Sequence, residues 1–280
     1  MKILKSFNMK EQSNMKVGGI AQEFIVVEKK DEIIEALELG NKNFILGNGT
    51  NTLLNDDKLN RTFISLKEIN YIKELGNNTV EVGAGLDFDK LIEYMGEHNY
   101  SGLENLAGIP GTVGGLVFMN GGAYGTEIFD CITAVEIVDE NNNIKNIKKE
   151  DLKFTYRRTE IQEKSWVVLS ATFKFENGYQ KDIVEDRMGK RQERHPLNMP
   201  NLGSTFKNPQ GNFSAKLIID AGMQGFTKGG AQVSTVHPNF IVNNGTATFQ
   251  DILDLIREVK EKVKETSGIE LEEEIIIVKD

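Results

Sequence analysis

Cysteine, proline and tryptophan are scarce in this chain. Its 280 residues include one cysteine, Cys131, one tryptophan and 5 prolines. A single cysteine cannot form an internal disulfide and offers no thiolate cluster for zinc or an iron–sulfur centre. We interpret Cys131 as a small buried thiol. His98, His195 and His237 are far apart in the sequence and match no metal-ligand spacing, so we predict no metal site.

Long apolar runs and an excess of basic residues are also missing. No stretch approaches the ~18 apolar residues of a membrane span, and the N-terminal sequence MKILKSFNMKEQSNMK lacks the apolar core of a secretory signal. With 33 basic against 42 acidic residues, the formal charge is −9. This charge argues against nucleic-acid binding. We expect a soluble cytoplasmic protein without membrane insertion. An anionic small ligand stays compatible, because charges are screened beyond about 8 Å at physiological salt.

Helix and strand patterns alternate without an internal repeat, which predicts an α+β fold. We expect helices from Asp31 to Leu39, capped by Asp31, from Asp87 onward, and after a capping box that begins at Thr248. The charged stretch 182–194 is interpreted as a solvated helix that joins two lobes, with a domain boundary near 185–200. Strands are expected at 44–46, 63–66, 79–82, 132–138, 166–175 and 275–278.

Glycine, in contrast, is abundant, and its positions are informative. The chain has 27 glycines, about one residue in ten, against an average of ~7%. Eight glycines lie between Gly102 and Gly125. This density predicts little regular secondary structure and free backbone amides that can face an anion, with Asn120 bridging turns through its side chain.

A second glycine motif, GNGTNT at 47–52, follows a predicted strand as a phosphate-binding loop would. It lacks the third glycine of the dinucleotide fingerprint, and the chain has no P-loop, which argues against a P-loop nucleotide hydrolase. The two glycine motifs together predict a diphosphate held by backbone amides and by the side chains of Thr50, Asn51 and Thr112. This arrangement indicates a dinucleotide bound outside a Rossmann fold.

A third motif, GSTFKNP at 203–209, places Ser204 after a glycine. It does not match the G-x-S-x-G of serine hydrolases, and no nearby histidine has an obvious triad partner, so hydrolase chemistry is disfavoured. From the residues alone, Ser204 is interpreted as a turn or capping residue.

Seven segments in a fixed order resemble one enzyme family. They are KVGG at 16–19, ILGNGTNTLL at 45–54, the glycine-rich 102–127, YRRT at 156–159, GSTFKNP at 203–209, HPNFIVNNGTAT at 237–248 and LEEE at 271–274. The set covers nearly the whole chain and is similar to the UDP-N-acetylenolpyruvoylglucosamine reductases (MurB), flavoenzymes of bacterial cell-wall synthesis.

The resemblance implies a fold and an activity. The fold is α+β, a two-lobed FAD-binding fold of the vanillyl-alcohol-oxidase (PCMH) type followed by a smaller α/β substrate-binding domain. The implied ranges are 1–65 and 66–190 for the FAD-binding lobes, with 271–280 returning to the first, and 191–270 for the substrate-binding domain. The implied activity is NADPH-dependent reduction of an enolpyruvyl UDP-sugar to UDP-N-acetylmuramate through FAD. The oligomeric state is left open, and a monomer is compatible with the sequence.

The family motifs also imply individual roles. Ser204 matches the proton donor, and Arg157 and Glu274 match the pair near the substrate carboxylate. Tyr156, Lys207 and Asn208 are implied substrate contacts. The implied FAD contacts come from the first two glycine motifs: Gly47, Asn48, Gly49, Thr50, Asn51, Thr52, Gly111, Thr112, Gly114, Gly115, Asn120, Gly122 and Ala123.

Other interpretations stay open beside the resemblance. Without it, Arg157 or Arg158 would be interpreted as a member of a surface ion pair and Glu274 as one of several solvated acids. A flavoenzyme of the same fold that oxidises an alcohol, or an inert nucleotide-sugar sensor, are alternative functions. The sequence departs from the family pattern at Thr159, at Gln224 and after LEEE. The short interval before Ser204 implies a compact subgroup without the inserted tyrosine loop.

Overall fold

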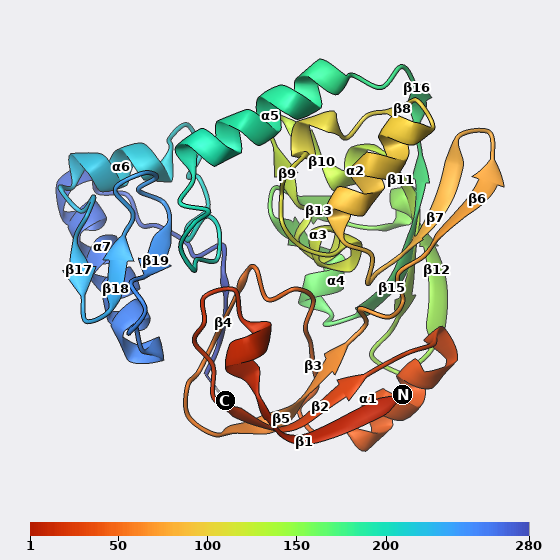
Figure 1. Ribbon diagram of the computed structural model, residues 1–280, viewed down its shortest axis with the longest axis horizontal. Helices are drawn as coiled ribbons and strands as arrows, with labels where there is room; N and C mark the ends of the chain where they lie inside the picture. The colour runs from red at the N-terminus through yellow and green to blue at the C-terminus, as the bar shows by residue number, and fades with distance from the viewer. Residues whose placement is uncertain (280) are drawn as a thin grey trace. The chain divides into compact units, whose positions relative to one another are not determined.

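The computed structural model describes residues 1–279, which form two compact units (Figure 1). Unit 1 comprises Met1–Lys5, Glu23–Gly47 and Arg61–Gly189. Unit 2 comprises Ser6–Gln22, Asn48–Asn60 and the chain from Lys190 onward. Because 6–22 and 48–60 group with the C-terminal part, the units differ in their bounds from the three functional ranges expected above, which stay a prediction.

The larger sheet of unit 1 has five strands, in the order β12-β11-β15-β7-β6, and every neighbouring pair is antiparallel. Its strands are β6 (Ile72–Gly76), β7 (Thr79–Gly83), β11 (Ile132–Val138), β12 (Ile144–Lys148) and β15 (Val167–Lys174). Apolar side chains alternate along β7 and β11, so Val80, Val82, Val135 and Ile137 are fully buried. The strands expected at 79–82, 132–138 and 166–175 are thereby confirmed.

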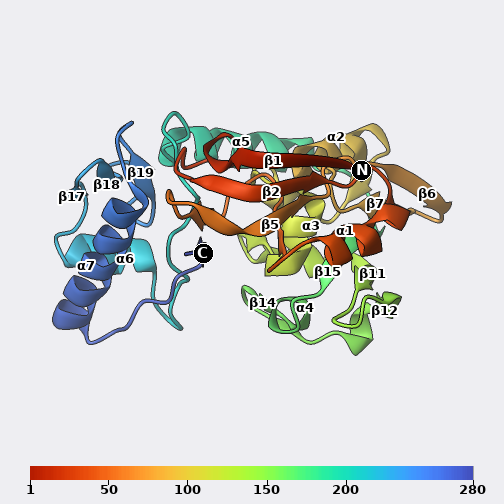
Figure 2. The ribbon, with the colours of Figure 1, turned by 90° about the horizontal axis from the view of Figure 1, so that it is seen from below.

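A four-stranded sheet has the order β1-β2-β5-β3, from β1 (Lys2–Asn8), β2 (Ile20–Val26), β5 (Leu59–Ser65) and β3 (Phe44–Ile45). The β3–β5 pair is parallel and sets Phe44 opposite Phe63. Helix α1 (Ile33–Leu39) lies beside this sheet in both views (Figures 1 and 2). It buries Ile33 and Ala36 in the core of unit 1.

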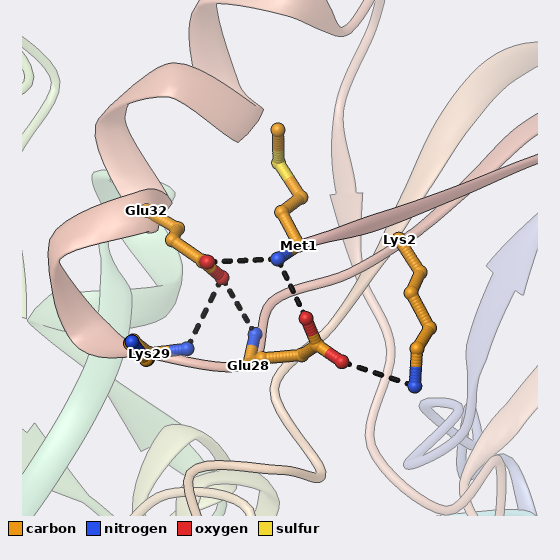
Figure 3. Close-up of polar contacts among 5 residues, drawn as sticks. All are labelled: Met1, Lys2, Glu28, Lys29 and Glu32. Atoms are coloured by element: carbon orange, nitrogen blue, oxygen red, sulfur yellow. Dashed lines mark hydrogen bonds and ion pairs between the residues drawn. The ribbon is translucent and has the colours of Figure 1, made fainter.

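The start of the chain is held by charged groups (Figure 3). The Met1 amine donates to Glu28 Oε2 at 2.8 Å and to Glu32 Oε1 at 2.7 Å. The amine and Lys2 hold the pKa of Glu28 down at about 2. Glu32 also accepts from the Glu28 and Lys29 amides, and residues Lys30–Glu32 form the 3-10 turn η2. The expected cap at Asp31 is therefore wrong: α1 begins only at Ile33, after the turn that Glu32 closes.

Unit 1 contains three further whole helices and three strand pairs. The helices are α2 (Phe88–Glu97), α3 (Val113–Met119) and α4 (Glu160–Glu163), and α5 (Lys181–Arg194) begins in unit 1 and ends in unit 2. The strand pairs are β9 (Gly122–Ala123) with β10 (Thr126–Glu127), β13 (Phe154–Thr155) with β14 (Arg158–Thr159), and β8 (Tyr100–Ser101) with β16 (Glu176–Asn177). The remaining 3-10 turns are η3 (Glu104–Leu106), η4 (Ile128–Asp130) and η5 (Lys149–Asp151). Asp87 is the N-cap residue of α2 as expected, and α5 is largely exposed.

Helix α3 corrects one expectation, because it lies inside the glycine-rich segment predicted to lack regular structure. Thr112 caps it, with Oγ1 accepting from the Gly115 amide at 3.2 Å. Val113 and Val117 are fully buried. A Cβ on Gly114 would lie 2.7 Å from Ala84 Cβ, so glycine there allows α3 to approach the loop after β7 closely. Capping and apolar burial thus outweigh the low helix propensity of glycine.

Unit 2 has its own core and a three-stranded antiparallel sheet, β17 (Thr227–Lys228), β18 (Ala231–Val233) and β19 (Ile241–Asn243). It also holds α6 (Ser214–Asp220), the 3-10 turn η1 (Met9–Gln12), and the parallel pair β4 (Thr52–Leu54) and β20 (Ile276–Val278). Helix α7 (Phe249–Ser267) lies against this sheet in both views (Figures 1 and 2). The expected Thr248–Asp251 capping box is confirmed.

Two simpler expectations can be compared with the fold. Cys131 is buried, and burial raises the pKa of its thiol to about 12, so the interpretation as a small buried thiol is confirmed. Among residues 1–279, no helix combines the length and the apolar character that crossing a bilayer requires.

Candidate functional site

Inside unit 1, the first residue of one predicted FAD motif lies beside the other motif. Gly47, which follows β3, lies so close to Thr112 that a Cβ on it would be 2.9 Å from Thr112 Oγ1. Gly111, the residue before, has φ 141°, a conformation that favours glycine. Residues 65 positions apart in the sequence are thus brought together with no side chain between them. This proximity was expected of a diphosphate site but could not be derived from either motif alone.

The backbone amides of the second motif are used unequally. Val113 and Gly114 donate to Leu86 O and Ala84 O, both at 2.8 Å. Within residues 1–279, the amides of Gly111 and Thr112 donate to no protein acceptor. Within the second motif, the Gly111 and Thr112 amides are therefore the ones that can bind an anion. The Val113 and Gly114 amides instead hold the start of α3 in place.

Asn120 ends α3 in the left-handed conformation at φ 46° and is fully buried. Its Nδ2 donates to Glu127 Oε2 at 2.7 Å and to Thr155 O at 3.0 Å, which confirms the expected bridging of turns. Its Oδ1 is buried without a protein partner among the described residues. Buried polar atoms are normally paired, so this oxygen indicates a missing ligand.

The first motif continues in unit 2 with a tight backbone. Gly49 has φ 64°, and a Cβ there would lie 1.9 Å from Gln12 O. Gly49 O accepts from the Asn14 amide at 3.1 Å. Asn51 Nδ2 donates to Glu274 O at 3.2 Å, and Asn51 O accepts from the Ile276 amide at 2.9 Å. Asn51 therefore binds the backbone of residues 274–276 through both its side chain and its carbonyl. This places residues 274–276 next to the glycine motif at 47–52.

These residues fit FAD. In unit 1, Gly47 lies beside Thr112 with no side chain between them, and the amides of Gly111 and Thr112 can donate to an anion. The orphaned Asn120 Oδ1 can accept a hydrogen bond from a donor that the protein does not supply. Of the remaining predicted contacts, Gly122 and Ala123 form β9 and Thr52 begins β4.

Arg157 lies at the turn between β13 and β14 in unit 1. Its Nη1 donates to Asn120 O at 3.1 Å, and its Nη2 donates to Gly122 O. The guanidinium carbon is 4.7 Å from the centre of the exposed Tyr156 ring. Arg157 is therefore hydrogen-bonded to the backbone of residues 119–122, the segment that contains Asn120.

Ser204 and Glu274 belong to unit 2, where their backbones run side by side. The Glu274 amide donates to Thr205 O at 2.8 Å, and the Lys207 amide donates to Glu272 O at 2.9 Å. Ser204 and Glu274 are both half-buried. Tertiary structure thus brings together two predicted residues that are 70 positions apart.

The three acids of LEEE differ in their surroundings. Glu272 is 2.7 Å from the Lys207 ammonium, and Glu273 is bound by Lys260 at 2.8 and 2.9 Å. Glu274 instead lies beside Ser204 through its backbone and accepts at its carbonyl from Asn51. The three acids therefore have different surroundings, and the role of the Glu274 carboxyl stays a prediction.

Lys207 and Asn208, the predicted substrate contacts of this unit, have protein partners. The Lys207 ammonium is paired with Glu272, and only 17% of its side chain is exposed. Asn208 Oδ1 accepts from the Ser214 amide at 3.0 Å at the start of α6. Their roles toward substrate stay predictions.

Two buried polar residues near these motifs were missed from the sequence. Ser13 is 1% exposed with an unpartnered Oγ, and it adjoins Asn14, which contacts Gly49. Asn239 is 4% exposed and bonds to the backbone after Ser204. Asn239 lies within the HPNFIVN segment, but only the fold shows its partner.

The described histidines form no catalytic pair with Ser204. The His195 and His237 rings lie 5.2 Å apart, edge to face. Burial lowers both pKa values, that of His195 to about 4, so both rings are neutral at pH 7. Among residues 1–279, no three His, Cys, Asp or Glu side chains are grouped to hold a metal ion.

Comparisons with known proteins agree with these motifs. The family model of an FAD-binding domain matches residues 21–148, and that of the UDP-N-acetylenolpyruvoylglucosamine reductase C-terminal domain matches 195–278. A UDP-N-acetylenolpyruvoylglucosamine reductase of Fusobacterium nucleatum subsp. nucleatum is 52% identical over 100% of both chains. One of Caldanaerobacter subterraneus subsp. tengcongensis is 41% identical over 96% of this chain and 91% of its own.

A solved structure is also similar. The crystal structure of UDP-N-acetylenolpyruvylglucosamine reductase (MurB) from Thermus caldophilus has a TM-score of 0.83 at 31% identity, covering 99% of this chain and 98% of that one. The chain is therefore an FAD-binding α+β protein with an additional C-terminal domain, which confirms the predicted fold class. It belongs to the UDP-N-acetylenolpyruvoylglucosamine reductase family.

Proposed function

We propose that this chain reduces the enolpyruvyl ether of UDP-N-acetylglucosamine-enolpyruvate to the lactyl ether of UDP-N-acetylmuramate, with NADPH as electron donor and FAD as cofactor. The observation that carries the proposal is the 52% identity, over the full length of both chains, to a reductase named for this substrate. The product is a precursor of peptidoglycan, so the enzyme serves cell-wall synthesis.

The glycine motifs supply the cofactor contacts in this proposal. In unit 1, the amides of Gly111 and Thr112 would donate to the FAD diphosphate, and Asn120 Oδ1 would accept a hydrogen bond from the cofactor. Bound FAD would supply the hydride chemistry, from NADPH to the terminal alkene carbon of the substrate. The residues of the chain orient the substrate and handle its charge and its proton.

Ser204 is the proposed proton donor. Hydride addition leaves an enolate-like carbon next to the substrate carboxylate, and the Ser204 hydroxyl gives its proton to that inner carbon. The two additions together, one hydride and one proton, saturate the alkene. A serine hydroxyl is a weak acid, but it serves here because the intermediate is strongly basic and is held in place.

Arg157 and Glu274 are the proposed partners of the substrate carboxylate. The Arg157 guanidinium is a permanent cation, and its bonds to Asn120 O and Gly122 O fix its position, so we assign it to the stabilisation of negative charge on the substrate. Glu274 would repel the enolate if ionised, so its protonated or hydrogen-bonded form is the one that serves. Tyr156, Lys207 and Asn208 are assigned to substrate binding.

The alternative of a flavoenzyme that oxidises an alcohol with oxygen is not favoured. It predicts flavin reduction by a small alcohol and no response to UDP-sugars. An inert nucleotide-sugar sensor would bind the substrate without turnover. Adding NADPH and then the enolpyruvyl substrate to the yellow protein, while the visible flavin absorbance is recorded, separates all three functions.

Replacement of Ser204 tests the assigned chemistry. Ser204→Ala should keep flavin reduction by NADPH and slow flavin reoxidation by substrate by ~10²–10⁴, because only the second step needs the proton. Ser204→Cys, which retains a proton donor, should recover part of that rate. Stopped-flow absorbance measures each step separately. Equal losses in both steps would remove Ser204 from this role.

The setting of the enzyme completes the proposal. We assign it to the cytoplasm, where NADPH and the UDP-sugar are available, with small-molecule partners and no nucleic acid. Residues 1–65 and 66–190 are assigned to FAD, and 191–270 to the substrate.

A further inference from the structure

The segment after Ser204 lies between two partners in unit 2. Its contacts with residues 272–274 on one side are described above. On the other side, the Thr205 amide donates to Asn239 O at 2.7 Å. Asn239 Oδ1 then accepts from the Phe206 amide at 3.0 Å, and Asn239 Nδ2 donates to Phe206 O at 2.8 Å. One side chain thus satisfies both backbone groups of Phe206, as a neighbouring β-strand would.

The hydrogen bonds between Asn239 and Phe206 are buried, so their loss would be costly. Thr205, Phe206 and Asn239 are 3%, 1% and 4% exposed. Water cannot replace a lost partner at such sites, so an unpaired backbone group there forces the segment to shift. Asparagine offers an acceptor and a donor on one short amide, whereas an ionised aspartate offers only acceptors and alanine offers neither.

Asn239 is itself held in a short, bonded connection between β18 and β19. The Ser234 amide donates to Phe240 O at 2.8 Å, and the Phe240 amide donates to His237 O at 2.9 Å. The His237 amide donates to Ser234 Oγ at 3.2 Å. The position of the Asn239 amide is therefore determined by the three-stranded sheet.

We propose that Asn239 is a positioning residue for proton transfer, acting through the backbone that directs the Ser204 hydroxyl. Gly203, on the other flank, has φ 74° and donates its amide to Asn201 Oδ1 at 2.9 Å. Ser204 is thus held from both neighbours. The inference rests on the proposed role of Ser204. A displacement of the Ser204 hydroxyl by about 1 Å would be enough to slow proton transfer by about 10²-fold.

The test uses Asn239→Ala and Asn239→Asp in the FAD-loaded enzyme. Flavin reduction by NADPH should stay unchanged, while reoxidation by the enolpyruvyl substrate should slow by ~10–10². The solvent deuterium isotope effect on reoxidation should rise, because proton transfer then limits the step. Asn239→Asp keeps the side-chain shape, so it provides the measurement if Asn239→Ala does not fold.

Asn243→Ala is the matched control in the same unit. Asn243 is also 4% exposed, and its side chain makes three hydrogen bonds. Its Nδ2 donates to Met15 O at 3.0 Å, and its Oδ1 accepts from the Gly245 amide at 2.7 Å and from the Ala247 amide at 3.0 Å. It should lower stability without raising the isotope effect. An equal loss of reoxidation rate in Asn243→Ala would overturn the inference.

A double variant separates this inference from the role of Ser204. In the Ser204→Ala background, Asn239→Ala should add little further loss, because its effect passes through the missing hydroxyl. Multiplied losses would contradict the positioning role. If Ser204→Ala alone leaves reoxidation intact, the proton-donor assignment fails. If it slows reoxidation while Asn239→Ala does not, only the positioning role fails.

Discussion

Among the predicted catalytic residues Ser204, Arg157 and Glu274, Arg157 alone has a positive φ. Its φ is 55°, while Tyr156, the other central residue of the two-residue turn, is not in the positive region. This is the pattern of a type II turn, where glycine is usual. A left-handed side-chain residue costs about 1–2 kcal/mol. The bonds to Asn120 O and Gly122 O hold the guanidinium at this turn, and we expect the strained backbone to serve the proposed role of Arg157.

Gly49 is the residue whose replacement tests the first cofactor motif. In Gly49→Ala, the new Cβ would lie 1.9 Å from Gln12 O at φ 64°, and this backbone oxygen cannot turn away. We expect the free energy of unfolding to fall by ~1–3 kcal/mol and FAD affinity to fall at least ~10-fold, equivalent to about 1.4 kcal/mol. Flavin fluorescence titration of the apoprotein and urea unfolding measure the two effects.

Gly189→Ala is the control for that substitution. Gly189 lies in helix α5 without positive φ, and a Cβ there meets no atom within 4 Å. Alanine should stabilise the protein by up to ~1 kcal/mol through its helix propensity and leave FAD affinity unchanged. Unaltered FAD binding in Gly49→Ala would contradict the assignment of this loop.

The start, the end and the buried face of helix α7 can all be predicted from the sequence. Its start at Phe249 follows a reciprocal capping box, in which the Asp251 amide donates to Thr248 Oγ1 at 3.1 Å and the Thr248 amide to Asp251 Oδ2 at 2.9 Å. It ends at Ser267 and is followed by the C-cap residue Gly268, at φ 72°. Six apolar side chains on one face are buried: Phe249, Ile252, Leu255, Ile256, Val259 and Val263. All of these features are readable from the sequence, because they depend on residues within one helical turn.

Thr248→Ala tests the contribution of the cap. Loss of the side-chain acceptor should lower the free energy of unfolding by about 1 kcal/mol, which corresponds to a fall in Tm of about 2–4 °C for a chain of this size. Glu261→Ala, at an exposed position of the same helix, should stay within ~0.5 kcal/mol. Differential scanning calorimetry of both variants makes the comparison, and an equal effect would contradict the cap.

Stability of the whole molecule should depend on pH in two windows. The pKa of His195 is lowered by burial to about 4, so between pH ~6.5 and 4 the unfolded chain binds more protons than the folded one. The contribution of the neutral His195 to the free energy of unfolding is therefore fully present above pH ~6.5, and it is lost as the pH falls toward 4. The pKa values of Glu28 and Asp139 are lowered by their hydrogen bonds to cationic groups, so they add a second loss below pH ~4.5.

The first window can be assigned by substitution. In His195→Gln, the free energy of unfolding measured by urea denaturation should vary less between pH 6.5 and 4 than in the parent protein. His98→Gln, at an exposed histidine, is the control. If both variants keep the slope of the parent protein, the titration of His195 does not produce the acid sensitivity.

Local patterns in the sequence therefore predicted the α+β class, the main strands, α7 and the cofactor motifs, because periodicity, caps and glycine turns act over a few residues. The helical state of α3 was missed, since burial against β15 and β7 outweighs glycine propensity.

The contact of Gly47 with Thr112, the different surroundings of Glu272, Glu273 and Glu274, and the bonds from Asn239 to Phe206 appeared only with the fold. Each depends on which distant stretch lies alongside, and that is decided by the packing of the whole chain.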